Sequence, residues 1–439
     1  MRVLVLDDDL EHVGTPPEDV LERDQPRCRT ERCDVLRCHG SDDTHEPSMT
    51  GCERWTTGSR TVDDPCEHGL VRFAAIVLLA GCFSKPPRPD GTPDTDAPGD
   101  GTQVQGWLDG FSFRKHVTVT AAGATETLVN FPVGVVIEDS DLAAHAGSDG
   151  KDIVATAGDG ETLLATELAA YDNGSLELWV RMPELAQAGA FFLYYGGPSQ
   201  APTTAVWDGP TFAGVWHLSE SGRARDSTAQ DNTLDAPATQ NPASFAGGMF
   251  GPARQLDGDD QLDGGDPVDG SLDFGASSFS YSLWVFQTEL GVGGFDTPFY
   301  KGGGSGQEPG YCFLLGTANW TVKLTDTANH SADPELGSAL PFQNQWVHVA
   351  AVVDRTADTV TAYANGVAKS AQSIATQQLG SVATTHSIQV GRGTEQPFKG
   401  RLDELRIYKT AITQAWLATE VRNGTDPSFL TLGPEELER

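Results

Sequence analysis

The sequence is short of positive charge. It holds 29 Lys and Arg against 62 Asp and Glu, which gives a formal net charge of −33. A surface of this sign cannot neutralise a run of phosphates, so we expect no nucleic-acid partner. The same charge opposes an electrostatic attraction to anionic lipid. Most of these carboxylates are expected to lie on a solvated acidic surface, which keeps a protein soluble.

Long apolar runs are also missing. The segment Phe73–Ala80 follows Arg72 and is far too short to span a bilayer, but its length is typical of a signal peptide. It ends in Leu-Ala-Gly-Cys at residues 79–82, which resembles a bacterial lipobox. The resemblance implies that residues 71–82 are a lipoprotein signal and that the thiol of Cys82 is lipidated. We therefore expect an outer-membrane lipoprotein of the cell envelope, on its surface or periplasmic face, that touches the membrane only through its lipid anchor.

Cysteine is scarce after residue 82, where only Cys312 remains, so we expect no structural disulfide there and a buried Cys312. Five other cysteines lie in residues 1–70, and the first three, Cys28, Cys33 and Cys38, have a C-x4-C-x4-C spacing that matches no common zinc site. That segment lacks Lys and apolar periodicity, so it cannot bury enough surface to fold alone. Three interpretations of residues 1–70 are possible: a misplaced start of translation, a disordered tail, or a metal site. Residues 83–106 are rich in Pro, Gly and Asp and predict a linker.

Residues 107–208 predict a first β-sandwich domain. Short apolar runs such as 131–137, 175–180 and 190–195 alternate with turn signals, of which Gly147-Ser148-Asp149-Gly150 is the clearest. The adjacent Tyr194 and Tyr195 must point to opposite faces of a strand, so at least one is expected in the core. This pattern resembles an uncharacterised bacterial family, domain of unknown function 2341, which often precedes jelly rolls. The resemblance implies no known chemistry.

Residues 209–433 predict a second antiparallel β-sandwich. The runs at 346–353, 359–363, 387–390 and 400–408 are short and β-favouring, and Asn365-Gly366 predicts a tight hairpin turn. One stretch, 412–420, has apolar residues at helical spacing. The order of these segments resembles the LamG-like jelly roll, a concanavalin A-like lectin and glucanase fold. The resemblance implies an all-β protein of two antiparallel sandwiches, of a class whose members usually bind and rarely catalyse.

Motifs for catalysis are absent, and we predict no catalytic residue and no enzyme. No G-x-S-x-G elbow, H-E-x-x-H or P-loop occurs. Asp403 and Glu404 are adjacent, so on a regular strand they face opposite sides and cannot act as a pair. We expect His217 and His348 to be packing histidines, and Trp216, Trp284 and Trp346 to be core anchors.

Oxygen ligands for a metal are abundant. Because lectin-like sandwiches often hold a structural Ca²⁺, we predict one bound by Asp226, Asp231 and Asp403. The alternative is that these residues, like Asp257, Asp259 and Asp260, only form Asx turns.

The sequence as a whole favours a lectin-like binding protein of the bacterial envelope, whose partner is a glycan or an envelope protein. Its ligand-binding residues cannot be named, because specificity lies in loops. The alternatives are a docking component of an envelope complex and, less well supported, a polysaccharide hydrolase.

Overall fold

The computed structural model describes residues 106–438 except 122, 202–204, 290–293, 305–307, 340 and 394–395. Contacts divide the chain into Met1–Pro93 and Asp94–Arg439, and every described residue belongs to the second unit. The predicted signal segment, Cys82 and most of the predicted linker therefore lie outside the described residues. No described helix is both long and apolar enough to cross a membrane.

The prediction of an all-β protein is confirmed, because strands dominate and the helices are few and short. The first sandwich has two antiparallel sheets. One sheet runs β24 (Leu430–Leu437), β1 (Phe113–Val119), β6 (Gly189–Tyr195), β3 (Val154–Ala157), and the other runs β2 (Leu128–Glu138), β5 (Ser175–Leu185), β4 (Thr166–Asp172). Tyr194 and Tyr195 are both fully buried and belong to different apolar clusters, as their adjacent positions on a strand require.

The jelly roll has two larger sheets. The eight-stranded sheet runs β20 (Val367–Ser373), β19 (Thr359–Ala364), β18 (Val347–Asp354), β11 (Phe279–Gln287), β23 (Lys399–Tyr408), β9 (Ala253–Asp257), β8 (Ala243–Phe245), with β7 (Phe212–Trp216) also on β23. The nine-stranded sheet runs β10 (Leu262–Gly265), β21 (Ile388–Val390), β13 (Phe299–Gly302), β14 (Gly310–Gly316), β12 (Phe295–Thr297), β22 (Gln396–Pro397), with β15 (Asn319–Thr325), β16 (Ser331–Ala332) and β17 (Glu335–Ser338) attached through β15. Their facing side chains form one apolar core.

The predicted hairpin turn at Asn365-Gly366 joins β19 to β20. Both residues have positive φ, 51° and 71°, the conformation that a two-residue hairpin requires. Within the described residues three helices accompany the sheets: α1 (Ser140–His145), α2 (Ile374–Gln377) and α3 (Gln414–Thr425). The helix predicted at 412–420 is confirmed as α3, whose first turn is capped by the side chain of Thr413.

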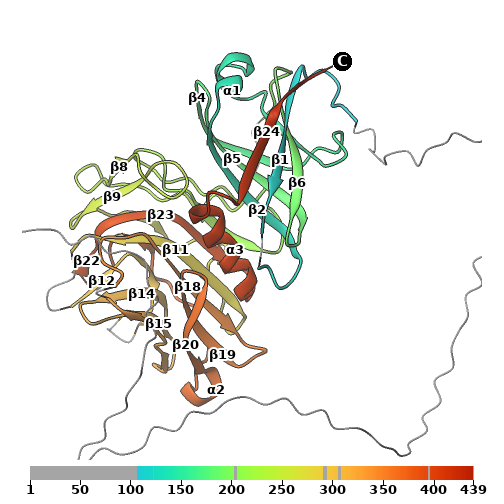
Figure 1. The fold of residues 1–439 in the computed structure, drawn as a ribbon. Helices are drawn as coiled ribbons and strands as arrows, with labels where there is room; N and C mark the ends of the chain where they lie inside the picture. The colour runs from blue at the N-terminus through green and yellow to red at the C-terminus, as the bar shows by residue number, and fades with distance from the viewer. Residues whose placement is uncertain are drawn as a thin grey trace, which may run out of the picture. The chain divides into compact units, whose positions relative to one another are not determined.

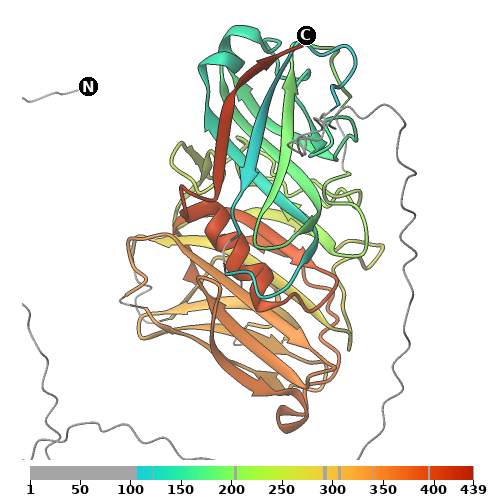
Figure 2. The ribbon, with the colours of Figure 1, turned by 45° about the vertical axis from the view of Figure 1, so that its right-hand side comes forward.

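A second core joins the two sandwiches. It fills the first sandwich, includes Trp416 and Leu417 of α3, and reaches Val352 and Tyr408 on the outer face of the eight-stranded sheet. In both views α3 lies between the two sets of sheets (Figures 1 and 2). The eight-stranded sheet is therefore covered on both faces over part of its area.

The last strand returns to the first sandwich. β24 pairs antiparallel with β1, so it lies at the edge of the first sheet although it follows the whole jelly roll in sequence (Figure 1). The domain bounds predicted from the sequence, 107–208 and 209–433, do not place β24 in the first sandwich. The first sandwich is completed only by residues from the end of the chain.

Candidate functional site

A pocket of about 360 Å³ lies where the first sandwich meets the jelly roll. The first sandwich supplies Thr166–Ala169 of β4, and the segment after β7 supplies His217, Glu220 and Asp226. Polar and apolar side chains share its wall, and its volume is within the range of about 300–1,000 Å³ that small-molecule sites occupy.

β7 and the turn after it position the pocket residues that come from the jelly roll. β7 pairs with β23 inside the eight-stranded sheet. Leu218, two residues after its end, has a φ of 60° and is fully buried, an uncommon conformation for a residue with a side chain. This turn leaves His217 at the junction and sends Glu220 to the pocket wall.

His217 forms the buried centre of the junction. Its Nδ1 lies 2.6 Å from Glu404 Oε1 of β23, and its Nε2 lies 3.3 Å from Glu167 Oε2 of β4. Its ring stacks on Trp179, with ring centres 5.3 Å apart. Burial alone would lower the pKa of His217, but Glu404 and Glu167 outweigh it and hold the pKa well above the usual value. His217 is therefore an imidazolium that pairs with a carboxylate from each sandwich.

Arg406 extends this ion-pair network, because it pairs with Glu404 and also with Glu420. Its guanidinium donates to Glu404 Oε2 at 2.7 Å and to Glu420 Oε1 of α3 at 2.9 Å. Tyr408 and Trp416 donate to the same oxygen of Glu420, at 2.7 and 3.0 Å. The two carboxylates compensate the buried guanidinium.

A β-bulge places Asp403 and Glu404 on the same side of β23, so the expectation that they face opposite sides is wrong. Leu402 and Leu405 flank them and both point into the jelly-roll core. Glu404 has a φ of 51°, and the pairing of β23 with β11 shifts register at this point. The extra residue of a bulge turns its side chain to the other face, which is how Glu404 reaches His217.

Two buried carboxyls beside this network are incompletely paired. Glu177 of β5 has no hydrogen-bond partner for either oxygen among the described residues, and Asp403 has none for Oδ1. Burial raises the pKa of Glu177 to about 8, and it raises the pKa of Asp403 well above its usual value. Glu177 is therefore mostly protonated at neutral pH.

The three predicted calcium ligands do not form a common cluster. Asp226 accepts hydrogen bonds from the backbone N–H groups of Val215, Thr228 and Asn232 and from the hydroxyl of Thr228, so its carboxylate closes its own loop. Asp403 Oδ2 accepts the N–H groups of Met249 and Phe250 instead.

Asp231, the third predicted ligand, is exposed. Its Oδ1 accepts the hydroxyl of Thr233 at 3.2 Å. Asp226 therefore stabilises a turn in this structure, which is the alternative to a role as a calcium ligand.

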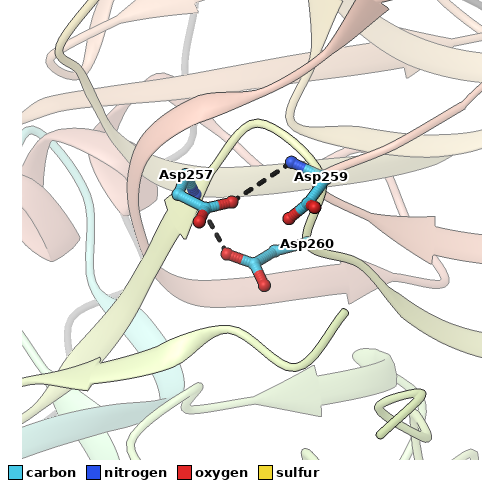
Figure 3. Close-up of side chains that lie close together, drawn as sticks. All are labelled: Asp257, Asp259 and Asp260. Atoms are coloured by element: carbon cyan, nitrogen blue, oxygen red, sulfur yellow. Dashed lines mark hydrogen bonds between the residues drawn. The ribbon is translucent and has the colours of Figure 1, made fainter. Parts of the chain in front are cut away.

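Among the described residues, the one group of three acidic or metal-ligating side chains whose ligand atoms lie within 4.8 Å of one another is Asp257, Asp259 and Asp260. Asp257 accepts the N–H of Asp259, and Asp260 accepts the N–H of Asp257 (Figure 3). These are the contacts of a tight turn after β9.

The remaining predicted residues are mostly core. Trp216 and Trp284 are buried, whereas Trp346 is partly exposed. His348 packs against Trp284, and burial together with Arg406 lowers its pKa to about 3, so it is a neutral packing histidine as expected. Cys312 is fully buried, also as expected.

His217 is the residue whose role the sequence analysis missed. Its partner Glu404 lies 187 residues away in the sequence. No spacing rule relates the two, because only the pairing of β7 with β23 brings them together.

Together the sheets and their shared core define an all-β protein whose larger part is a concanavalin A-like jelly roll. Residues 257–418 match the family described as the concanavalin A-like lectin/glucanases superfamily. This match supports the predicted LamG-like jelly roll. No curated protein matches the chain.

Solved structures are similar to 48% of the chain, and two of the three described below are binding domains. The binding domain of Paraclostridial Mosquitocidal Protein 1 is 17% identical with a TM-score of 0.40, and 52% of it is covered. The ligand-binding domain of botulinum neurotoxin serotype D, solved with N-acetylneuraminic acid, is 12% identical with a TM-score of 0.39 and 50% covered. Domain 4 of a GH43 arabinanase from Geobacillus stearothermophilus, solved with arabinotriose, is 23% identical with a TM-score of 0.35 and 99% covered. The chain thus spans about half the length of the two toxin domains, and scores this low carry no functional argument.

Proposed function

We propose that this protein binds a glycan in the pocket between its two sandwiches. The observation that carries the proposal is the pocket itself: about 360 Å³, walled by polar and charged side chains, next to a domain of a lectin and glucanase superfamily. Polar groups placed around a partly apolar hollow are the usual means of orienting a small ligand.

We propose binding rather than catalysis, because two of the three carboxylates that line the pocket are already engaged. Glu167, the pocket carboxylate nearest His217, is engaged by His217 and by the indole N–H of Trp207. Asp226 accepts three hydrogen bonds from its own loop and one from Val215. Neither carboxylate is left available as a general base.

The experiment is a glycan array followed by titration of the best ligand against two variants of β4. Ala169 lines the pocket, so Ala169→Trp fills it and weakens binding by at least about tenfold. Ala170 is exposed and does not line the pocket, so Ala170→Trp binds like the native chain. A thermal melt confirms that both variants are folded. Unchanged affinity in folded Ala169→Trp would remove the pocket from the proposal, and a blank array would refute glycan binding.

The envelope location belongs to the same proposal. It rests on the lipobox-like residues 79–82, with Cys82 as the acylated residue. Mass spectrometry of membrane-extracted protein should find an acylated Cys82 at the N-terminus. Recovery of peptides from residues 1–60 in the mature protein would contradict it.

A further inference from the structure

A strip of partly exposed side chains crosses the outer face of the eight-stranded sheet. It comes from β8, β23, β11 and the residue before β18, and consists of Phe245, Arg401, Phe286 and Trp346. Leu402, Val285 and Val347, the chain neighbours of the last three, point into the jelly-roll core. Side chains alternate along a strand, so this aromatic strip faces away from that core. None of its residues lines the pocket.

Arg401 is held in the middle of the aromatic strip. Its Cζ lies 3.7 Å from the centre of the Phe245 ring and 4.6 Å from that of the Phe286 ring. The two rings come from strands on either side of β23, so the guanidinium lies between them. Its Nε donates to Gln255 Oε1 at 2.9 Å. Trp346 extends the strip beyond Phe286, with ring centres 5.7 Å apart.

No carboxylate compensates this cation within the part of the chain that the structure describes. Nη1 and Nη2 of Arg401 have no hydrogen-bond partner there, whereas Arg406 pairs with two carboxylates and Lys399 pairs with Glu289. Arg225 also lacks an ion pair among the described residues, but it is exposed and no ring holds it. A guanidinium fixed at Nε, with both terminal nitrogens unengaged, presents the pair of donors that matches a carboxylate.

The aromatic strip also offers ring surface to a ligand. Phe286 and Trp346 are partly exposed, and the C–H face of a pyranose buries apolar area when it packs on such rings. Neighbouring strands lie about 4.8 Å apart, so the strip spans roughly 19 Å from β8 to the start of β18, enough for a short oligosaccharide. A peptide rich in Asp or Glu would bring many charges to a chain of net charge −33, whereas a sugar acid brings few.

We infer that the aromatic strip is a second saccharide site, which selects sugars that carry a carboxylate, such as uronic acids. Arg401 donates to the ligand carboxylate through Nη1 and Nη2, and the sugar ring packs on Phe286 and Trp346. The inference goes beyond the proposed glycan pocket, because the strip and the pocket share no residue.

Titration of the full chain with three disaccharides measures this selectivity at pH 7. The disaccharides share a digalactose backbone and differ only at carbon 6 of one ring, which carries a carboxylate, its methyl ester or a hydroxymethyl group. The carboxylate form should bind about tenfold more tightly than the other two, since charged hydrogen bonds are the stronger ones. Raising the salt concentration should narrow this preference. An array with the same three groups on glucose and mannose backbones covers the case of a different ring.

Four variants separate the roles of charge and ring surface. Arg401→Gln should reduce the preference to within about twofold, and Arg401→Lys, which keeps the charge on a single donor atom, should retain only part of it. Lys369→Gln removes the same charge from an exposed position of β20 in the same sheet and should leave the preference intact. Trp346→Ala should weaken binding of all three disaccharides alike. Melting curves show which variants are folded.

The outcomes distinguish this site from the pocket. Equal affinity for the carboxylate and hydroxymethyl forms on every backbone, or an unchanged preference in folded Arg401→Gln, overturns the inference. Ala169→Trp fills the pocket and should leave binding of the carboxylate form unchanged, so loss of that binding would place the sugar acid in the pocket and overturn the inference. If only neutral glycans fail to bind, the proposed pocket function fails while this inference stands.

A hexaglutamate peptide tests the other class of acidic ligand. It should bind more weakly than the acidic disaccharide. Tighter binding of the peptide than of every acidic saccharide would assign the aromatic strip to a protein partner and overturn the inference. An array on which no saccharide binds overturns both the inference and the proposed function.

Discussion

At the scale of single residues, Glu177 has the clearest pH-dependent consequence. It is 4% exposed, neither oxygen has a hydrogen-bond partner among the described residues, and burial raises its pKa to about 8. In the unfolded chain the same group titrates near its ordinary value, about 4.3. Between these two pKa values the unfolded state releases a proton that the folded state keeps. Stability contributed by this group therefore falls as pH rises from about 4.5 to 8.

We predict that Glu177→Gln becomes more stabilising, relative to the native chain, as pH rises from 5 to 8. The amide cannot ionise, so it removes a penalty of order a few kcal/mol at pH 8 and only about 1 kcal/mol at pH 5. Denaturant titrations at both pH values measure the difference. Glu184→Gln, an exposed change on the same strand, is the control. A stability difference that does not vary with pH would contradict the prediction.

Asp226 gives a second prediction at this scale. Its carboxylate is buried and accepts three hydrogen bonds from its own loop and one from Val215 of β7. Asp226→Ala leaves three backbone N–H groups without their acceptor and should lower the free energy of unfolding by about 3 kcal/mol in chelator. Asp226→Asn keeps one acceptor oxygen, so it should lower the free energy of unfolding by less. Thermal melts that show no loss in chelator would contradict this account.

The structural Ca²⁺ stays a prediction, and the same melts test it. An ion that binds only the folded state stabilises by RT ln(1 + [Ca²⁺]/Kd), about 2.7 kcal/mol at a hundredfold excess over Kd. Calcium should therefore raise the melting temperature of the native chain. If it does not, the aspartates named as ligands act only in turns.

At the scale of elements, regular patterns were predictable and departures from them were not. The alternation of β19 and its Asn365-Gly366 turn follow from local rules, and so does the helix that became α3. The bulge at Glu404 does not, because nothing local in the run at 400–408 marks it. Its single extra residue moves a carboxylate from the core face to the junction, where His217 neutralises it.

β24 provides the prediction for this scale. It forms the edge of the sheet next to β1, and its removal would expose the edge of β1 and uncover apolar residues of the first sandwich. A chain that ends at Phe429 should be less stable by several kcal/mol and should self-associate, since an unpaired strand edge can pair with another chain. Ultracentrifugation and melting measure the two effects. A monomer of native stability would show that β24 is dispensable.

At the scale of the whole molecule, the two sandwiches share one apolar core and one ion-pair network. Trp416 of α3 contacts Phe131 of β2, and Asn423 of α3 exchanges hydrogen bonds with the backbone of Gly134. His217 pairs with a carboxylate from each sandwich. Elements that share a buried core in this way unfold together.

We therefore predict a single cooperative unfolding transition for residues 106–439, with equal calorimetric and van't Hoff enthalpies. His217→Gln should weaken the junction. Because the folded pKa of His217 is raised, its contribution is complete below about pH 6.5 and is lost as pH rises through the folded value. The cost of the substitution should thus shrink at alkaline pH. Two separate transitions in the native chain would contradict the shared core.

The sequence by itself determined the all-β class and the position of α3, because strand alternation, turn chemistry and helical spacing are local properties of neighbouring residues. The lectin-like jelly roll followed from the resemblance of its segments to a known family. Only the tertiary structure decided where the site lies. The pocket, the pairing of His217 with Glu404 and the return of β24 to β1 all join residues far apart in the chain. Which distant residues meet depends on sheet pairing and on one bulge, and these are set by packing of the whole fold rather than by any local pattern.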